Sequence, residues 1–232
     1  FSASANPPAY CGAIPVFIDS EKETWNMFPK ALREALVDRT AKGNKPKAII
    51  VVHLYGMPAK MKEIVEIAQK YEIPLIEDAA EALGSTYQGQ NCGTFGELSI
   101  LSFNGNKIIT TSGGGALVCK TNEQKEKAIF LSTQARDNAP HYQHSEVGYN
   151  YRMSNISAGI GRGQMTVAQA HIDHHKHVQA LYEELLKGIP GIHMHCQPSD
   201  KRYDSNFWLC TATIDADVKV KGQDDAYKEI IK

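Results

Sequence analysis

The chain has 232 residues, a formal net charge of −1 at pH 7 and 42% hydrophobic residues, an ordinary globular composition with enough apolar mass for a sizeable core. The near-neutral charge gives no reason to expect a nucleic acid or a membrane surface as partner, and no apolar run approaches the ~20 residues of a membrane span. The five cysteines form no Cys-x-x-Cys pair, which favours free thiols in a reducing, cytoplasmic compartment.

Both ends of the chain indicate an internal portion of a longer protein. The first residue is not Met, and residues 1–7 are typical of the middle of an element. Residues 224–232 stop inside a helical pattern. We therefore expect the native protein to have further sequence on both sides of this chain.

The first clear elements predict a parallel sheet. Residues 48–53 form a short apolar, β-branched run, which is typical of a strand covered on both faces. Residues 60–71 repeat apolar side chains at a helical period, and residues 74–77 predict the next strand. Strand, helix and strand in this short space indicate a βαβ unit and hence parallel pairing.

The later elements predict more of the sheet and then a second unit. Residues 98–103 and 116–119 predict two strands, and residues 123–136 predict a helix. A long helical pattern over residues 164–187 ends at a group of Gly and Pro residues, and residues 207–214 look like a strand of a new unit. The pattern divides the chain into a large domain and the start of a second domain, residues 1–165 and 166–232.

Two residues at predicted strand ends indicate the chemistry. Lys107 follows the 98–103 strand and precedes a glycine-rich turn, and Asp78 ends the 74–77 strand. Pyridoxal phosphate enzymes need this combination, because the lysine forms a Schiff base and the aspartate keeps the pyridinium nitrogen protonated. Each residue also has a plainer interpretation, since most lysines are solvated and an aspartate often caps a helix. If a helical turn begins at Asp78, Glu81 shares its face and can address the same bound ring.

Three other patterns favour structural roles. The glycines at 113–115 lack the Gly-x-x-x-x-Gly-Lys pattern of a phosphate loop, so a tight turn between strands fits them better. The glycines at 159–163 lack the Gly-x-Gly-x-x-Gly spacing of an NAD site, and two of them, four residues apart, favour close helix packing, including packing across subunits. His171 and His175 share a helix face, but no further ligand completes a metal site, so we expect a solvated polar face and no metal.

Three motifs in order resemble the DegT/StrS family of nucleotide-sugar aminotransferases, which are fold-type-I pyridoxal phosphate enzymes. They are Glu-Asp-Ala-Ala-Glu-Ala-Leu-Gly at 77–84, Ser-Phe-x-x-x-Lys at 102–107 and Gly-Tyr-Asn-Tyr-Arg-Met-Ser at 148–154. The resemblance covers nearly the whole chain, to about residue 214. Residues 102–115 and 132–136 are similar, more narrowly, to aminotransferases that act on UDP-linked 4-keto-6-deoxy-N-acetylhexosamine in bacillosamine-type pathways. The family's usual acidic residue in the glycine turn is replaced here by glycine, which matches that subgroup.

The resemblance implies a role for each matching residue around the cofactor, pyridoxal 5′-phosphate. It implies that Lys107 is the Schiff-base lysine and that Asp78 pairs with the pyridinium nitrogen. It also implies that Glu81 approaches the ring hydroxyl, that Ser102 binds the cofactor phosphate and that Phe1 stacks on the ring.

Two further residues imply a homodimer. By resemblance, Asn150 and Arg152 reach the phosphate site of the partner subunit, so that the two subunits share their active sites. The family's upstream Gly-Thr phosphate loop and most of its small domain are missing from this chain. The implied fold is α/β, with an α/β/α large domain built on a mainly parallel sheet and a partial small C-terminal α+β domain.

The resemblance implies an aminotransferase. Its expected reaction moves the amino group of L-glutamate to the C4 ketone of a nucleotide-linked 4-keto-6-deoxy sugar, UDP-2-acetamido-2,6-dideoxy-hexos-4-ulose, for surface polysaccharide or glycan biosynthesis. Two alternatives stay open. One is a pyridoxal phosphate-dependent sugar dehydratase, although such relatives replace the lysine with histidine and this chain keeps Lys107. The other is a non-catalytic relative or sensor with the same fold, against which the intact Asp78, Glu81, Ser102 and Lys107 argue.

Overall fold

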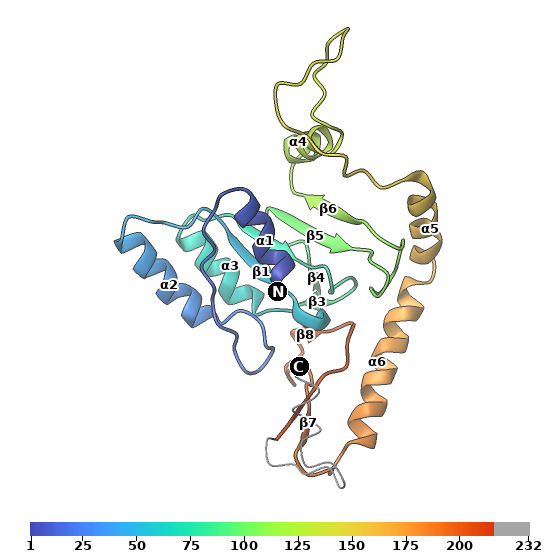
Figure 1. The fold of residues 1–232 in the computed structure, drawn as a ribbon. Coiled ribbons are helices and arrows are strands. Elements are labelled where there is room, and N and C mark those ends of the chain that lie inside the picture. Colours follow the sequence, from blue (N-terminus) through green and yellow to red (C-terminus); the bar gives the residue numbers. More distant parts are fainter. Residues whose placement is uncertain (216–232) are drawn as a thin grey trace, which may run out of the picture.

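The computed structural model describes residues 1–215 (Figure 1). Its helices are α1 (Ser2–Tyr10), α2 (Pro29–Ala41), the 3-10 helix η1 (Leu54–Gly56), α3 (Met61–Lys70), α4 (Asn122–Ser132), α5 (Asn155–Met165) and α6 (Ala168–Leu185). Its strands are β1 (Ile49–Val52), β2 (Leu75–Asp78), β3 (Thr86–Tyr87), β4 (Gln90–Asn91), β5 (Leu98–Ser102), β6 (Gly115–Cys119), β7 (Ile192–Met194), β8 (Tyr203–Asp204) and β9 (Ala212–Ile214). No helix of the described residues is long and apolar enough to cross a membrane.

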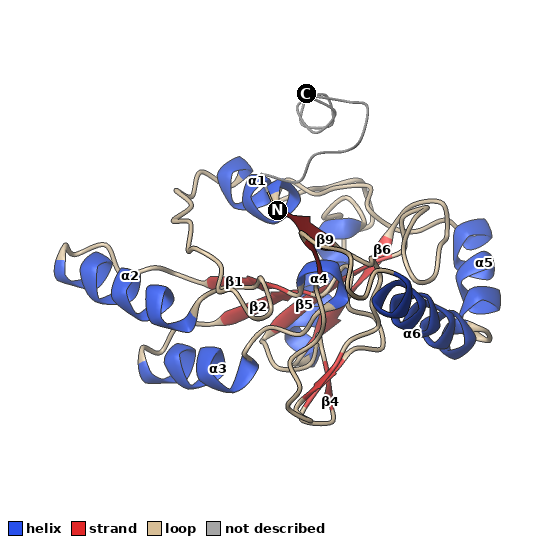
Figure 2. Cartoon of the chain, turned by 90° about the horizontal axis from the view of Figure 1, so that it is seen from below, coloured by secondary structure: helices blue, strands red, loops and turns tan. Residues whose placement is uncertain are grey.

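The main sheet has the strand order β1-β2-β5-β6, and its topology confirms the predicted α/β fold. β1 pairs with β2 and β2 pairs with β5 in parallel, whereas β6 returns antiparallel to β5. β1, α3 and β2 form the predicted βαβ unit. Helices α1 and α3 lie on opposite sides of these strands (Figure 2), so the sheet is the middle layer.

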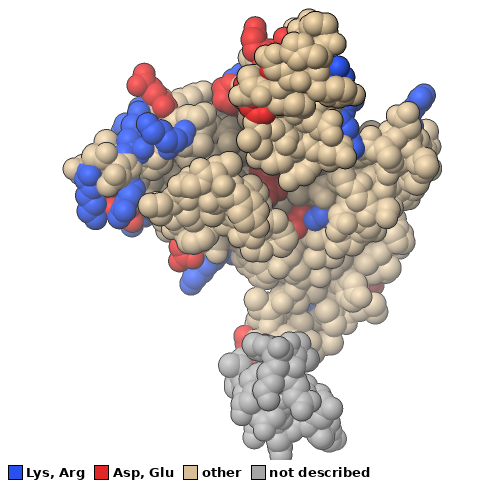
Figure 3. All heavy atoms as spheres, turned by 45° about the horizontal axis from the view of Figure 1, so that its top comes forward, with Lys and Arg blue, Asp and Glu red and all other residues tan. Residues whose placement is uncertain are grey.

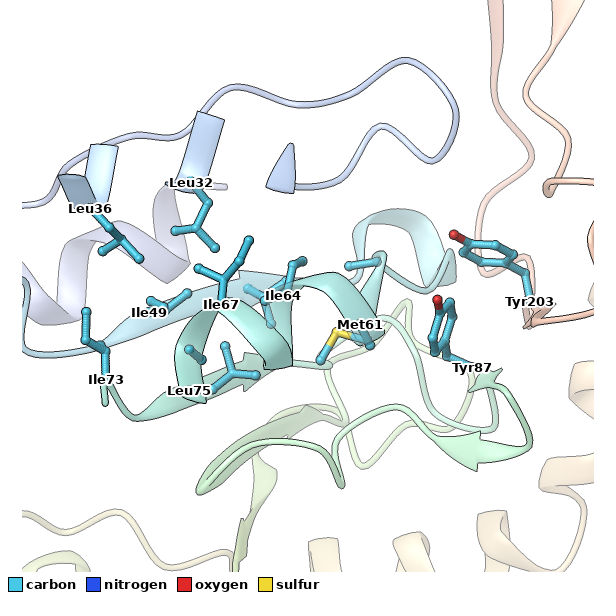
Figure 4. Close-up of a cluster of buried hydrophobic side chains, with 13 residues drawn as sticks. Leu32, Leu36, Ile49, Met61, Ile64, Ile67, Ile73, Leu75, Tyr87 and Tyr203 are labelled. Carbon is cyan, nitrogen blue, oxygen red and sulfur yellow. The ribbon is translucent and has the colours of Figure 1, made fainter. Parts of the chain in front are cut away.

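A hydrophobic core between α2, α3 and the sheet fixes this unit (Figure 4). The buried residues of α3 recur at helical spacing because its apolar stripe faces the sheet; they are Met61, Ile64, Ile67 and Ala68. Leu32 and Leu36, one turn apart on α2, pack against the same cluster. Burying each large side chain contributes about 1.5–3 kcal/mol, so the cluster holds β1 and β2 firmly in register.

Two predicted helices have different ends in the structure. Helix α4 starts at a capping box of Thr121 and Gln124 and ends at Ser132, earlier than predicted. Gln134 and Ala135 have φ angles of 69° and 48°, and a right-handed helix cannot continue through left-handed residues. The predicted helix at 164–187 corresponds to α6, which starts four residues later because Val167, at its N-cap, has a non-helical backbone that separates it from α5.

The C-terminal part of the described chain forms strands of two smaller sheets, one of which returns to the hydrophobic core. The predicted strand at 207–214 is reduced to β9, because Phe207 adopts a φ of 48° that no strand accommodates. β9 pairs with β7, while β8 pairs with β3 and places Tyr203 in the core beside Tyr87. The division at residue 165 stays a prediction, and the helical pattern of 224–232 lies outside the described residues.

Candidate active site

Asp78 lies at the carboxyl end of β2, the edge at which open α/β sheets bind ligands. Its Oδ1 accepts a hydrogen bond from the backbone N–H of Ala80 at 3.2 Å. Its Oδ2 accepts one from the hydroxyl of Ser4 in α1 at 2.5 Å. Tight turns, rather than a helical turn, follow Asp78, so Glu81 reaches the site by another route than the shared helix face.

A buried carboxylate next to Asp78, that of Glu77, is surrounded by hydrogen-bond donors that anchor the end of β2. His53 Nε2 lies 3.0 Å from a carboxylate oxygen of Glu77, and His53 Nδ1 accepts the Ala59 N–H, so the imidazole proton is on Nε2. The Glu77 carboxylate also accepts three backbone N–H groups at 2.6–2.7 Å, from Gly93, Phe95 and Gly96. Burial raises the pKa of Glu77, but the bonds from His53 and the backbone outweigh it, so the pKa is lowered and Glu77 stays ionised.

Lys107 is paired with Glu81 in the interior, which excludes the interpretation of a surface lysine in a hairpin. Its Nζ lies 3.4 Å from Glu81 Oε1, and its side chain is only 11% exposed. The other oxygen of Glu81 accepts the backbone N–H of Tyr55 at 2.7 Å. Tyr55 has a φ of 58°, a sparsely populated conformation that marks local strain beside this carboxylate. Acidic and basic atoms meet in a recess near the centre of one face of the molecule (Figure 3).

The loop that carries Lys107 joins β5 to β6 and is itself anchored. Ile108 and Ile109 are buried, and they hold the segment after the lysine against α6. The glycines at 113–115 form a bend that leads into β6 instead of the predicted tight turn, with Gly114 at a φ of 91° and Gly115 already in the strand. At Gly115 an added Cβ would lie 2.2 Å from the carbonyl oxygen of Leu101, so only glycine allows this strand pairing.

Trp208 forms the other wall around Lys107, and no local sequence pattern indicated it. The Lys107 Nζ lies 3.8 Å from the centroid of the Trp208 ring. The indole N–H donates to the carbonyl of Asn106 at 2.6 Å, across 102 positions of sequence. A single tryptophan in a predicted strand belongs to no repeating pattern, so the sequence alone does not indicate its contact with a residue about 100 positions away.

Asn206 joins the Trp208 segment to the turn after β2. Its side-chain N–H group donates to the carbonyls of Glu81 and Leu83, each at 2.9 Å. Its Oδ1 accepts the backbone N–H of Trp208 at 2.9 Å. The side chain is fully buried, and Gly56 leaves the space it needs, since a Cβ there would lie 1.8 Å from Asn206 Oδ1.

His171 and His175 of α6 are half-buried and dock the helix, whereas His174 and His177 are exposed and keep the solvated polar character that the sequence predicts. His171 Nδ1 lies 3.0 Å from the carbonyl oxygen of Ile108, the neighbour of Lys107. Burial, followed by the nearby His174 and His171, lowers the pKa of His175, and a bond to the Phe207 backbone offsets part of that effect. α6 therefore braces both segments that surround Lys107.

The structure brings some of the predicted site residues together and leaves others apart. Strand pairing sets Asp78 opposite Ile100, two residues before Ser102, whose hydroxyl accepts the Asn104 N–H at 3.4 Å. Phe1 precedes α1 and is 73% exposed.

Asn150 and Arg152 are exposed and lie between α4 and α5, in a segment that extends away from the sheet (Figure 1). Among residues 1–215, no hydrogen bond or ion pair links either of them to Lys107, Glu81 or Asp78.

The donor set fits pyridoxal phosphate. A nearly buried primary amine suits an aldehyde carbon, and a carboxylate at the strand edge suits a protonated ring nitrogen. An α/β sheet that presents these groups at its carboxyl edge is typical of the fold-type-I class of pyridoxal phosphate enzymes.

Comparison with known proteins identifies the family. The model of the DegT/DnrJ/EryC1/StrS aminotransferase family matches residues 1–230, and the chain belongs to this family. Its cofactor, as predicted, is pyridoxal phosphate.

The chain is 51% identical over 215 residues to EpsN of Bacillus subtilis (strain 168), named as a pyridoxal phosphate-dependent aminotransferase, covering 93% of this chain and 55% of EpsN. It is 39% identical over 193 residues to GDP-perosamine synthase of Escherichia coli O157:H7, covering 83% and 51%. A crystal structure of a DegT DnrJ EryC1 StrS aminotransferase from Brucella abortus superposes with a TM-score of 0.85 at 26% identity, covering 93% of this chain and 57% of that one. The chain thus spans about half the length of the curated relatives it matches.

Proposed function

We propose that the protein transfers an amino group from L-glutamate to the C4 ketone of a nucleotide-linked 4-keto-6-deoxy sugar, with UDP-2-acetamido-2,6-dideoxy-hexos-4-ulose as the substrate. The observation that carries the proposal is the nearly buried amine of Lys107, 3.4 Å from Glu81, at the edge of the sheet where Asp78 ends β2. Family membership and the similarity to GDP-perosamine synthase support amino transfer to a nucleotide sugar. The retained lysine favours transfer over dehydration.

In this proposal the residues of the chain perform three tasks. The bound pyridoxal phosphate supplies an electron sink. Asp78, held by Ser4 and Ala80, keeps the ring nitrogen protonated by placing a fixed negative charge beside it. The Lys107 amine holds the cofactor and, when free and neutral, moves a proton from the donor Cα as a general base. Glu81 fixes the direction of the lysine side chain.

The active unit in this proposal is a homodimer with shared sites. The support is an unpartnered face of α5, where Ile156 is 80% exposed and the glycines 159 and 163 have no neighbour within 4 Å of an added Cβ in the described chain. Asn150 and Arg152 precede this face and would reach the site of the partner. Mixed dimers of Lys107→Ala and Arg152→Ala subunits should regain activity, because one of their two sites is intact; mixtures as inactive as either parent would contradict shared sites.

Replacing the lysine tests the proposed function. In the full-length protein, Lys107→Ala should bind pyridoxal phosphate without covalent linkage and lose at least the ~10²–10⁴-fold contribution of a general base. Borohydride reduction followed by mass spectrometry should place the cofactor on Lys107. Lys120→Ala is a matched control, since Lys120 is also paired with a glutamate, Glu97, at 2.8 Å, but on the surface.

The aspartate and the substrate need separate measurements. Asp78→Asn should keep the fold and lose most of the activity; unchanged rates would refute the pyridinium role. Product analysis with glutamate and UDP- or GDP-linked 4-keto sugars tests the substrate. An enzyme that aminates only the GDP-linked sugar would refute the UDP assignment while leaving amino transfer in place. A fully active Lys107→Ala enzyme would refute the whole proposal.

A further inference from the structure

The amine of Lys107 lies between an aromatic face and a carboxylate. The ring centroid of Trp208 is 3.8 Å from Nζ, and Oε1 of Glu81 is 3.4 Å from the same atom. Trp208 is 6% exposed, so the cation meets the ring in a largely dry environment. An ammonium over an indole face is attracted most strongly when both groups are shielded from water.

Two hydrogen bonds fix the position of Trp208, one from its indole N–H and one from its backbone N–H. Its indole N–H bonds the carbonyl of Asn106, the residue before Lys107, at 2.6 Å. Its backbone N–H bonds Asn206, which also bonds the Glu81 carbonyl at 2.9 Å. The same two connections therefore set the ring against the lysine loop and against the turn that carries Glu81. The position of the Trp208 ring therefore depends on the lysine loop and on the Glu81 turn together.

We propose that Trp208 is a positioning residue for Lys107. With Glu81 it forms a cradle that holds the ε-ammonium when the lysine is released from the cofactor and protonated. The inference rests on the proposed function, because amino transfer requires the lysine to be released from the cofactor in the first half-reaction and to rejoin it at the end of the second.

The release defines what the cradle stabilises. When bound, the cofactor would hold Lys107 through a protonated imine at Nζ. The donor amine would replace Nζ at that carbon, and the two protons that the donor ammonium loses would leave Nζ as an ammonium. The product is the ammonium that the indole face binds. On rejoining, one water or one amine leaves, and Nζ gives up the ammonium form. Trp208 therefore favours the released state over the joined state.

The first test needs no cofactor. The measurement is the equilibrium constant of unfolding of the full-length apo protein in urea. Trp208→Leu should raise this constant by a larger factor when Lys107 is present than when Lys107 is replaced by Met. The ratio of the two factors should be about 2- to 30-fold, as for a shielded cation–aromatic pair. Trp208→Phe should preserve most of this ratio because it keeps an aromatic face. Equal factors in both backgrounds would refute the proposal that Trp208 holds the Lys107 ammonium.

A matched control comes from the other tryptophan of the chain. Trp25 stacks on His195 with a centroid separation of 3.9 Å and takes no part in the site. Trp25→Leu should therefore alter the unfolding constant equally with and without Lys107. A lysine-dependent effect there would mean that the cycle reports general loosening, and would overturn the interpretation of the Trp208 result.

The second test measures the affinity for pyridoxal phosphate. Trp208→Leu should lower the dissociation constant about 2- to 30-fold in the Lys107 protein, because the released ammonium loses a partner. It should leave the constant unchanged in the Lys107→Met background. Weaker binding in both backgrounds would make Trp208 a wall of the cofactor pocket and overturn the proposal. If borohydride fixes no cofactor on Lys107 in the unsubstituted protein, the proposed function fails, and the apo cycle alone still decides whether the cradle exists.

Discussion

Asn206 offers a direct test of how the site is assembled. Its fully buried side chain connects three backbone groups that belong to two distant segments, the turn after β2 and the segment that contains Trp208. Asn206→Ala removes one acceptor and two donor bonds while leaving the backbone bond of residue 206 to Ser85 in place. The carbonyls of Glu81 and Leu83 and the N–H of Trp208 then lose their partners.

The cost follows from the number of groups left unpaired. Each buried backbone group without a partner costs about 1–3 kcal/mol, and water entering the vacated volume recovers part of that. Three such groups give a loss of about 3–5 kcal/mol in the free energy of unfolding, a large fraction of the 5–15 kcal/mol of a typical domain. Asn206→Asp should cost at least as much, because a charged acceptor replaces the donor that faces two carbonyl oxygens.

The assay is equilibrium unfolding of the full-length protein in urea, with Asn44→Ala as the control. The side chain of Asn44 is exposed and makes one long bond, 3.3 Å, to the carbonyl of Lys42, so its replacement should change stability by less than about 0.5 kcal/mol. The near-isosteric Asp variant separates hydrogen bonding from packing. A loss below 1 kcal/mol for Asn206→Ala, or a nearly neutral Asn206→Asp, would refute the reasoning.

Two more predictions concern the same region. Gly56→Ala should cost about 2–5 kcal/mol, because a left-handed backbone at φ 86° and a Cβ 1.8 Å from Asn206 Oδ1 both oppose the side chain. Gly43→Ala, at φ 73° with open space around it, should cost only the backbone part. Equal losses of stability in urea for the two variants would contradict the clash. Burial lowers the pKa of His175 below its ordinary 6.5, so the unfolded chain binds the proton more readily; the resulting stability is present above about pH 6.5 and is lost as the pH falls toward the folded pKa. Thermal unfolding between pH 8 and 5 should show a shallower loss for His175→Gln, and parallel curves would refute this linkage.

The parts of the fold that were predictable are those recorded in local periodicity. The apolar run of β1, the helical stripe of α3 and the strand β2 lie within one stretch of chain, and their pairing follows from the βαβ rule. Asp78 and Lys107 were predictable as candidates for the same reason, because Asp78 ends one strand and Lys107 follows another. Their family motif then gave the cofactor.

The missed parts depend on contacts between distant segments or on backbone conformations without a residue signature. Ser4 bonds Asp78 across 74 positions, and Trp208 bonds Asn106 across 102. No spacing in a single sequence reports such pairs. Gln134 and Ala135 are left-handed although neither is glycine, so the end of α4 could not be read from composition. The docking of His171 depends on where α6 lies and not on the helix sequence.

The contact between Trp208 and the lysine loop also sets an order of events during synthesis. The β1–α3–β2 unit can pack as soon as residues up to β2 have left the ribosome, since its core is largely local. Trp208 and Asn206 are synthesised only after about 130 residues have been added beyond the end of β2. A nascent chain therefore presents Asp78, and then Lys107, before Trp208 and Asn206 can hold the lysine in place.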